Sequence, residues 1–202
     1  TITGLKYDLD YKISPNFGLD IPMEQISKGN GESCVLSAYS SSVINLSNHF
    51  TTSLGITAQY FTLNKNWTVE PRAALKWTFN PKHALALAYG LHSRRERLDY
   101  YFVEQEVNGK TESNRYLNFP KAHHFGLTYD WNINSYMHLK VEPYYQYLFR
   151  IPVEENSSFS IINHQSFYLE RILKNRGSGV NYGIDITLEQ YMKNGFYYMI
   201  TA

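Results

Sequence analysis

Residues 122–150, AHHFGLTYDWNINSYMHLKVEPYYQYLFR, determine the fold, because polar and apolar residues alternate more strictly here than elsewhere in the chain. In the first arm every second residue is apolar: Phe125, Leu127, Tyr129, Trp131 and Ile133. After a turn expected at Asn134-Ser135, the second arm repeats the pattern with Leu139, Val141, Tyr145, Tyr147 and Phe149. A period of two residues predicts a β-hairpin with one apolar and one polar face.

The length of the two arms indicates a membrane protein. Each arm runs for more than ten residues, whereas strands of globular proteins usually have about 5–6 residues. A tilted strand that crosses a bilayer needs about 9–11 residues. The sequence therefore predicts an all-β fold, an antiparallel meander of long strands that is a fragment of a transmembrane β-barrel.

The composition agrees with a barrel and excludes several other classes. Aromatic residues make up 16% of the 202 residues, which suits the aromatic girdles of membrane barrels. The mean hydropathy of −0.41 and the lack of a long apolar run exclude a transmembrane helix. A net charge of +1 gives no reason to expect nucleic acid as a partner. The single cysteine, Cys34, cannot form an internal disulfide and does not indicate a compartment.

Similar alternation along the chain predicts about nine strands. They are expected over 1–12, 33–46, 49–62, about 72–79, about 84–91, the two arms, 180–191 and from 196 onward. Within 33–46, Val35, Tyr39 and Val43 are expected on the outer face. Short connections are expected at 47–48, 80–82, 134–135 and 193–195, and longer ones at 14–32, 63–67, 92–118 and 152–178. Short turns at one rim and long loops at the other are typical of outer-membrane barrels.

Several stretches carry a resemblance to a known family. They are Trp67–Arg72 leading to Leu85–Gly90, then His123–Tyr129, Leu139–Gln146 and Asn181–Asp185. In their order and spacing they resemble the later part of the barrel of TonB-dependent outer-membrane receptors of Bacteroidetes-type bacteria. The resemblance covers most of the chain from about Ser33 onward.

The resemblance implies a barrel of about twenty-two strands filled by an N-terminal plug. Such receptors sit in the bacterial outer membrane and import a scarce nutrient, such as a metal chelate, a vitamin or an oligosaccharide, with energy delivered by TonB. The family's plug, TonB box and closing strand have no counterpart here, so residues 1–202 are expected to be a single piece of the barrel domain that starts inside a longer protein. The implied partners are outer-membrane lipid, the plug domain, the TonB complex and an unknown nutrient ligand.

Charged and polar residues opposite the apolar positions are expected to face the lumen. They are Arg72, Lys76, Thr128, Asp130, Lys140, Glu142, Asp185 and Glu189. A pair of catalytic carboxylates is the alternative interpretation of Asp130, Glu142, Asp185 and Glu189. We favour a hydrated wall in which these groups pair with nearby cations or contact a plug.

The loop 93–118 holds the candidate ligand contacts. Guanidinium groups and aromatic rings there could grip an anionic or sugar ligand. The candidates are Arg94, Arg95, Arg97, Tyr100, Tyr101 and Phe102. A solvated loop of mixed charge is the alternative, and the favoured, interpretation. Both this loop and 152–178 are expected to face outward.

No catalytic, cofactor or metal site is predicted. His123 and His124 are adjacent in a strand, so their side chains point to opposite faces and cannot chelate one ion together. Ser93 beside His92 is the nearest approach to a hydrolase pair, and neighbours on a strand diverge. The chain is therefore not expected to be an enzyme. Two alternatives stay open: a passive porin-like or structural outer-membrane barrel, and a soluble β-sandwich binding module.

Overall fold

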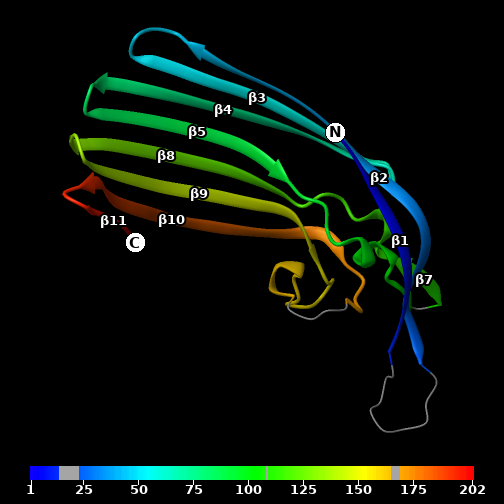
Figure 1. Ribbon diagram of the computed structural model, residues 1–202. Helices are drawn as coiled ribbons and strands as arrows, with labels where there is room; N and C mark the ends of the chain where they lie inside the picture. Colours follow the sequence, from blue (N-terminus) through cyan, green and yellow to red (C-terminus); the bar gives the residue numbers. More distant parts are fainter. Residues whose placement is uncertain (14–22, 108, 165–168) are drawn as a thin grey trace.

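The computed structural model describes residues 1–13, 23–107, 109–164 and 169–202. Within these residues, nine strands form one antiparallel sheet in the order β1-β2-β3-β4-β5-β8-β9-β10-β11 (Figure 1). Their bounds are β1 Ile2–Ile13, β2 Glu24–Asn45, β3 Phe50–Phe61, β4 Asn66–Asn80, β5 His83–Ser93, β8 Lys121–Asn134, β9 Met137–Val153, β10 Lys174–Lys193 and β11 Phe196–Thr201. The fold is a meander, because every strand of the sheet pairs with the preceding and following strand of that sheet.

The two long connections carry the remaining elements. Between β5 and β8 lie η1 (Leu98–Phe102), the short hairpin β6 (Glu104–Val107) and β7 (Lys110–Ser113), and η2 (Asn114–Tyr116). β6 and β7 pair from Glu104 opposite Ser113 to Val107 opposite Lys110. The β9–β10 connection contains η3 (Ile161–Asn163). Among the described residues, no helix is long and apolar enough to cross a membrane.

The central hairpin matches the prediction closely. β8 pairs with β9 so that Tyr129 lies opposite Val141 and Asp130 opposite Lys140. Paired residues in an antiparallel sheet project to the same face. Apolar side chains therefore meet on one face and polar side chains on the other, as the alternation requires.

Three strand boundaries and one connection differ from the predictions. β2 begins at Glu24 rather than near 33, β4 at Asn66 rather than near 72, and β10 at Lys174 rather than near 180. Residues 24–32 contain little alternation, yet their backbone pairs with the second half of β1, from Ile13 opposite Glu24 to Leu5 opposite Ser33. Backbone pairing alone thus extends this strand. The β3–β4 connection is a tight turn rather than a longer loop, and Lys65 within it has a positive φ of 58°. Residues 14–22 of the expected 14–32 loop lie outside the described residues.

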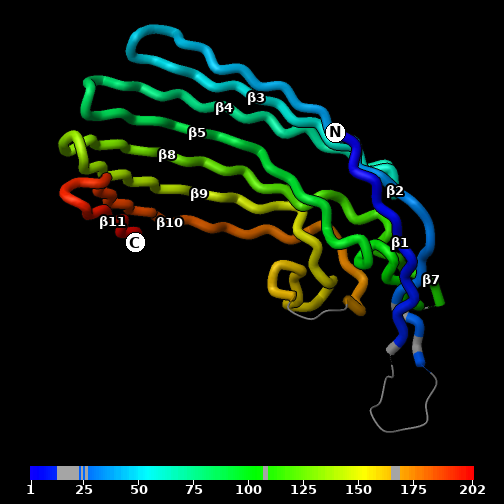
Figure 2. Tube along the Cα trace, viewed as in Figure 1, coloured from blue at the N-terminus to red at the C-terminus, as the bar shows by residue number. Residues whose placement is uncertain are grey.

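The strands curve into a wall with different connections at its two ends. Figure 2 shows the β2–β3, β4–β5, β8–β9 and β10–β11 turns at one end, and the two long connections at the other. The predicted alternation of short and long connections is thus present for these elements. One irregularity lies at the long-loop end: Arg150 has a positive φ of 55°, and the β9–β10 register shifts beside it at Gly177.

Candidate functional site

One face of the sheet, here called the apolar face, is lined by exposed hydrophobic side chains. It carries Leu54, Ile56, Leu75, Leu87, Phe125, Leu127, Tyr145 and Ile184, among others. The described strand stretches contain no Asp, Glu, Lys or Arg on this face over 50–60, 67–79, 83–91, 123–133 and 139–149. An exposed apolar surface of this extent requires contact with other apolar material.

Aromatic side chains gather at both borders of the apolar face. Near the tight turns, Phe50 stacks on Trp77 at 5.8 Å between ring centroids, and His83 stacks on Trp131 at 5.7 Å. Near the long loops, His123 stacks on Phe149 at 5.0 Å, and Trp67 lies opposite Tyr60. These two rows are the girdles that barrels place at the two membrane interfaces.

The distance between the girdles can be worked out from β4. Trp67 and Trp77 are ten residues apart on this strand. At about 3.3 Å per residue they are roughly 33 Å apart along the strand. A barrel strand is tilted by about 40°, which reduces the span along the barrel axis to roughly 25 Å, the height of the apolar band of a membrane barrel.

The opposite face, here called the polar face, carries all eight residues predicted to face the lumen. The register places Lys76, Ala86 and Thr128 side by side, and Glu142 opposite Asp185. Several polar side chains on this face pair with one another: Lys140 with Glu142 at 2.7 Å, His138 with Asp130 at 3.1 Å, and Thr128 with Glu142 at 3.2 Å. A paired, hydrated wall agrees with this arrangement better than a catalytic carboxylate pair does.

The face predicted for three residues of β2 is wrong. Val35 lies opposite Phe61, Tyr39 opposite Thr57 and Val43 opposite Ser53, all on the polar face. The apolar positions of β2 are instead the even-numbered ones, including Leu36 and Ile44.

The hydrophobic core lies at the long-loop end, where the two connections pack on the polar face. This loop core consists of Phe61, Tyr100, Tyr101, Phe102, Val103, Leu117, Phe119, Ile151, Ile161, Leu169 and Leu173, with Leu5, Tyr7, Leu9 and Val35 packed against it. Both loops were predicted to face outward. Their described parts pack on the polar face, the β5–β8 connection against Tyr7 of β1 and Phe61 of β3 and the β9–β10 connection against β9, because these apolar side chains bury one another there. The side of the membrane to which the loops face stays a prediction.

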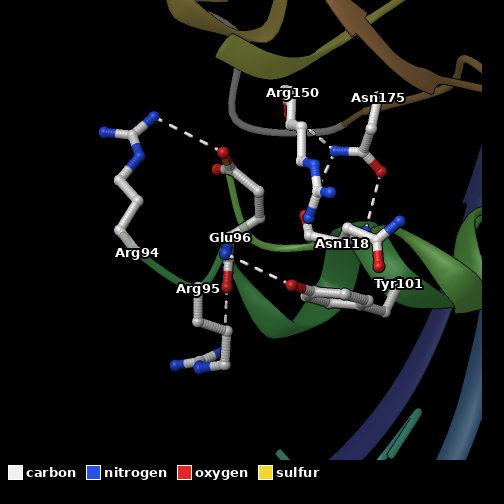
Figure 3. Close-up of polar contacts among 7 residues, drawn as sticks. All are labelled: Arg94, Arg95, Glu96, Tyr101, Asn118, Arg150 and Asn175. Carbon is white, nitrogen blue, oxygen red and sulfur yellow. Dashed lines mark hydrogen bonds and ion pairs between the residues drawn. The ribbon is translucent and has the colours of Figure 1, made fainter. Parts of the chain in front are cut away.

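Hydrogen bonds join the two connections inside the loop core. Asn114 is 1% exposed, and its side chain donates to the carbonyl of Arg171 at 2.8 Å and accepts from the N–H of Leu173 at 2.7 Å. Figure 3 shows a further, exposed link outside this core, in which the side chain of Asn175 on β10 donates to the carbonyl of Asn118 in the β5–β8 connection (3.1 Å) and to that of Arg150 on β9 (2.8 Å). The two connections therefore behave as one unit.

Glu96 and Tyr101 are ionisable groups within this unit. The N–H of Glu96 donates to the Tyr101 hydroxyl at 3.4 Å, and Arg94 lies 3.5 Å from its carboxylate (Figure 3). Burial raises the pKa of Glu96, while Arg94 and Arg95 oppose that shift. Burial also raises the pKa of Tyr101 to about 12. Both groups are thus held toward their neutral forms.

The candidate ligand contacts divide into two sets. Tyr100, Tyr101 and Phe102 are buried in the loop core, so their ring faces are not open to a ligand in this arrangement. Arg97 pairs with Asp99 at 2.9 Å, and the Arg95 guanidinium lies 5.6 Å from the Phe61 ring centroid. Arg94 is the most open of the set, with a side chain that is 65% exposed. A ligand role stays a prediction for the arginines, and ring stacking does not fit this conformation.

The sequence analysis missed a buried carboxylate on the polar face, that of Glu70. Glu70 is 2% exposed, and it accepts hydrogen bonds from Ser93 at 2.5 Å and Gln59 at 3.1 Å and pairs with Arg72 at 3.2 Å. The signal was present in the even-numbered run of β4, where Glu70 and Arg72 alternate with apolar residues. A buried carboxylate of this kind holds its neighbours in place.

The histidines do not form a metal centre. His123 lies on the apolar face, 3.0 Å from the Tyr89 hydroxyl, whereas His124 lies on the polar face near Gln146, so the prediction of opposite faces is confirmed. Within the described residues, no group of three or more His, Cys, Asp or Glu side chains could hold a metal ion.

Comparisons with known proteins relate this fold to that of known receptors. No family model and no curated protein matches the chain. A mutant of the ferric enterobactin receptor PfeA from Pseudomonas aeruginosa matches with a TM-score of 0.65 and 11% identity, over 86% of this chain and 27% of that one. The siderophore receptor PirA from the same species gives a TM-score of 0.63 and 11% identity, over 89% and 37%. The ferric-catecholate import receptor Fiu from E. coli K12 gives 0.61 and 9%, over 86% and 28%.

At such low identity these likenesses show the fold alone. They confirm the predicted fold class, an antiparallel meander that matches a section of a receptor barrel. The chain spans about a quarter of the length of the first receptor, 27%. All three proteins are described as receptors, and none of the three is described as an enzyme.

Proposed function

We propose that this chain is part of the barrel wall of a bacterial outer-membrane receptor that takes up a scarce nutrient in a TonB-dependent manner. The sequence resemblance implies this activity. The three structures that share the fold are described as receptors for ferric enterobactin, siderophores or ferric catecholates, which makes an iron chelate the first nutrient to test. A vitamin or an oligosaccharide is the alternative cargo.

The observation that carries the proposal is the apolar face with its two girdles. Its exposed aliphatic side chains have no polar interruption by Asp, Glu, Lys or Arg in the described stretches given above, and its height of roughly 25 Å matches a bilayer. A soluble β-sandwich would cover such a face with a second sheet. No element of the described chain covers it, which favours lipid as the contact of this face.

The polar face then lines the lumen of the complete barrel. Arg72, Lys76, Thr128, Asp130 and Lys140, together with Glu142, Asp185 and Glu189, would contact water or the plug domain of the full-length protein. Arg94, in the loop unit at one rim, is the candidate for a first contact with an anionic ligand. The TonB complex would act through the part of the receptor outside this chain.

Cysteine labelling tests the assignment of the two faces. Single cysteines are placed at 125 to 131 in the full-length protein, in a Cys34→Ser background, and a bulky water-soluble thiol reagent is applied to the protein in lipid. Labelling at 126, 128 and 130, without labelling at 125, 127, 129 and 131, is the expected result. Labelling without a two-residue period would remove the membrane strand and favour a soluble module.

An uptake assay tests the activity. Cells that express the full-length protein should accumulate radiolabelled iron from a ferric catecholate, and cells that lack TonB or the protein should not. Uptake that depends on the protein but not on TonB would favour a passive porin-like barrel. A lack of protein-dependent uptake of any iron chelate would redirect the search to vitamins and oligosaccharides.

A further inference from the structure

Seven strands contribute to one transverse row of residues on the polar face. The register joins them across the sheet in the order Ser41, Gly55, Arg72, Gly90, His124, Gln146 and Asn181. All seven project to the polar face, because directly paired residues share a face. In this row the side chains of Arg72, His124, Gln146 and Asn181 can each donate hydrogen bonds.

His92 completes the row at the position that Gly90 leaves open. A Cβ atom added to Gly90 would lie 2.6 Å from Nε2 of His92, so the imidazole of His92 lies directly over the glycine. The ring is thereby held beside His124, with 4.5 Å between the two ring centroids. We call the following set the donor row: Arg72, His92, His124, Gln146 and Asn181.

Two long hydrogen-bond contacts connect three members of the donor row, from Asn181 through Gln146 to His124. Asn181 donates to Gln146 at 3.3 Å, and the amide nitrogen of Gln146 lies 3.4 Å from Nδ1 of His124. These long contacts leave the imidazoles and amides able to bind another acceptor. The side chain of Arg72 is 49% exposed, although it also pairs with Glu70.

A cavity of ≈480 Å³ lies against this row. The next row along the sheet forms its floor with small residues, namely Ser53, Ala74, Ala88 and Gly126. Arg72, His92, His124 and Gln146 line its edge. The volume falls within the roughly 300–1,000 Å³ of small-molecule sites, and the floor lets a ligand approach the backbone closely.

Charge near the row favours an anion. A second cavity of ≈290 Å³ lies on the other side of the histidine pair and is lined by Lys121 and Arg94. The two carboxylates in this region, Glu70 and Glu96, are buried and each pairs with an arginine. The groups that reach the cavities are therefore hydrogen-bond donors and cations.

We propose that the donor row and the small-residue floor form a binding site for a ligand that carries an oxyanion, such as a carboxylate or a phosphate. The oxyanion accepts hydrogen bonds from Arg72, His92, His124 and Gln146, and the rest of the ligand lies over the floor. The inference rests on the proposed function, because this face borders a lumen only in the complete barrel. The oxyanion can belong to a free anion or to a metal chelate that carries it.

Equilibrium dialysis of the full-length protein in detergent tests the site with three probes: citrate, inorganic phosphate and ferric citrate. We expect saturable binding of at least one probe. A His92→Phe and His124→Phe double variant keeps both rings but removes their donors, and should bind that probe about tenfold or more weakly. Gly90→Ala should weaken binding similarly, since the added methyl group displaces the His92 ring.

The matched control is His138→Phe, a histidine on the same face near the opposite rim that pairs with Asp130. Its affinity for the probe should equal that of the wild type. Binding of citrate or phosphate supports a site for a free oxyanion, and binding of ferric citrate alone supports a site for a chelate. The absence of saturable binding for all three probes, or equal affinity in wild type, double variant and control, would overturn the inference.

The uptake assay separates this inference from the proposed function. If iron uptake depends on TonB while no probe binds, the oxyanion site fails and the receptor function stands. Probe binding that requires His92 and His124 in a protein without TonB-dependent iron uptake supports the site and contradicts an iron chelate as the cargo of the receptor.

Discussion

A pair of neighbouring substitutions gives the sharpest energetic test of the barrel wall. Leu127 is on the apolar face of β8, paired with Leu87, midway between the girdle residues His123 and Trp131. Leu127→Arg therefore puts a guanidinium near the bilayer midplane. A cation on the lipid face costs about 2–4 kcal/mol at that depth.

The adjacent residue provides the matched control. Thr128 is on the polar face and donates to Glu142 at 3.2 Å. In Thr128→Arg the guanidinium extends into the polar face, where Glu142 and Asp130 are in reach, so the cost should stay within about 0.5 kcal/mol. Arginine at two adjacent positions of the same strand should thus give a large loss of folding free energy at 127 and a small one at 128.

The assay is the urea dependence of folding of the full-length barrel into lipid vesicles. Leu127→Arg should lower the folding equilibrium constant about 30- to 700-fold, which is about 2–4 kcal/mol at about 1.4 kcal/mol per factor of ten. Thr128→Arg should leave it within about threefold of the wild type. Equal costs for the two variants, or a larger cost for Thr128→Arg, would refute the assignment of the faces.

Three further predictions concern the loop unit. Asn114→Ala leaves the carbonyl of Arg171 and the N–H of Leu173 unpaired in the loop core, so it should destabilise the unit by about 1–3 kcal/mol, seen as faster proteolysis within the two connections. Burial raises the pKa of Glu96, so the closed loop unit binds a proton on this carboxyl more tightly than the opened unit does. Hydrogen exchange should therefore show the stability of the closed unit falling as pH rises above the ordinary Glu pKa of 4.5. Glu96→Gln should abolish this pH dependence. The difference in ultraviolet titration between wild type and Tyr101→Phe should show a phenol that ionises at about 12, and a midpoint near 10 would mean that the unit is open in solution.

The sequence predicted the wall of the structure well. Along β3, β4, β5, β8 and β9 one face needs an apolar contact, so most inward residues are polar or small and most outward residues are apolar. Phe61 and Leu148, which point inward at the loop core, are exceptions. This constraint repeats at every second position, and a single sequence displays it directly. This alternation therefore predicts the number of strands, the short turns, and the faces on which Leu127 and Thr128 lie.

The extended ends of β2 and β10 and the fold of the loops could not be predicted in the same way. Residues 24–32 and 174–179 lie beyond the region where alternation is enforced, and they are held by backbone pairing with β1 and β9. The donor row depends on register across several strands, since Arg72, His124 and Gln146 are far apart in sequence. The sequence contained one hint of this row, the Gly90-x-His92 spacing, which lets the His92 ring lie over the glycine.

The wrong face assigned to Val35 of β2 has the same physical origin as the loop core, whereas Tyr39 and Val43 are exposed on the polar face and lie outside that core. In a barrel wall the apolar face is outside, so an internal core can form only where something covers the polar face. The β5–β8 connection does so over β1 to β3, and there the inward positions become apolar, as at Leu5, Val35 and Phe61. Apolar residues on the inward positions near a long-loop rim therefore break the simple alternation because a loop packs on them. The exceptions at Leu5, Val35 and Phe61 thus mark where a connection packs on the polar face, just as the regular pattern marks the apolar face.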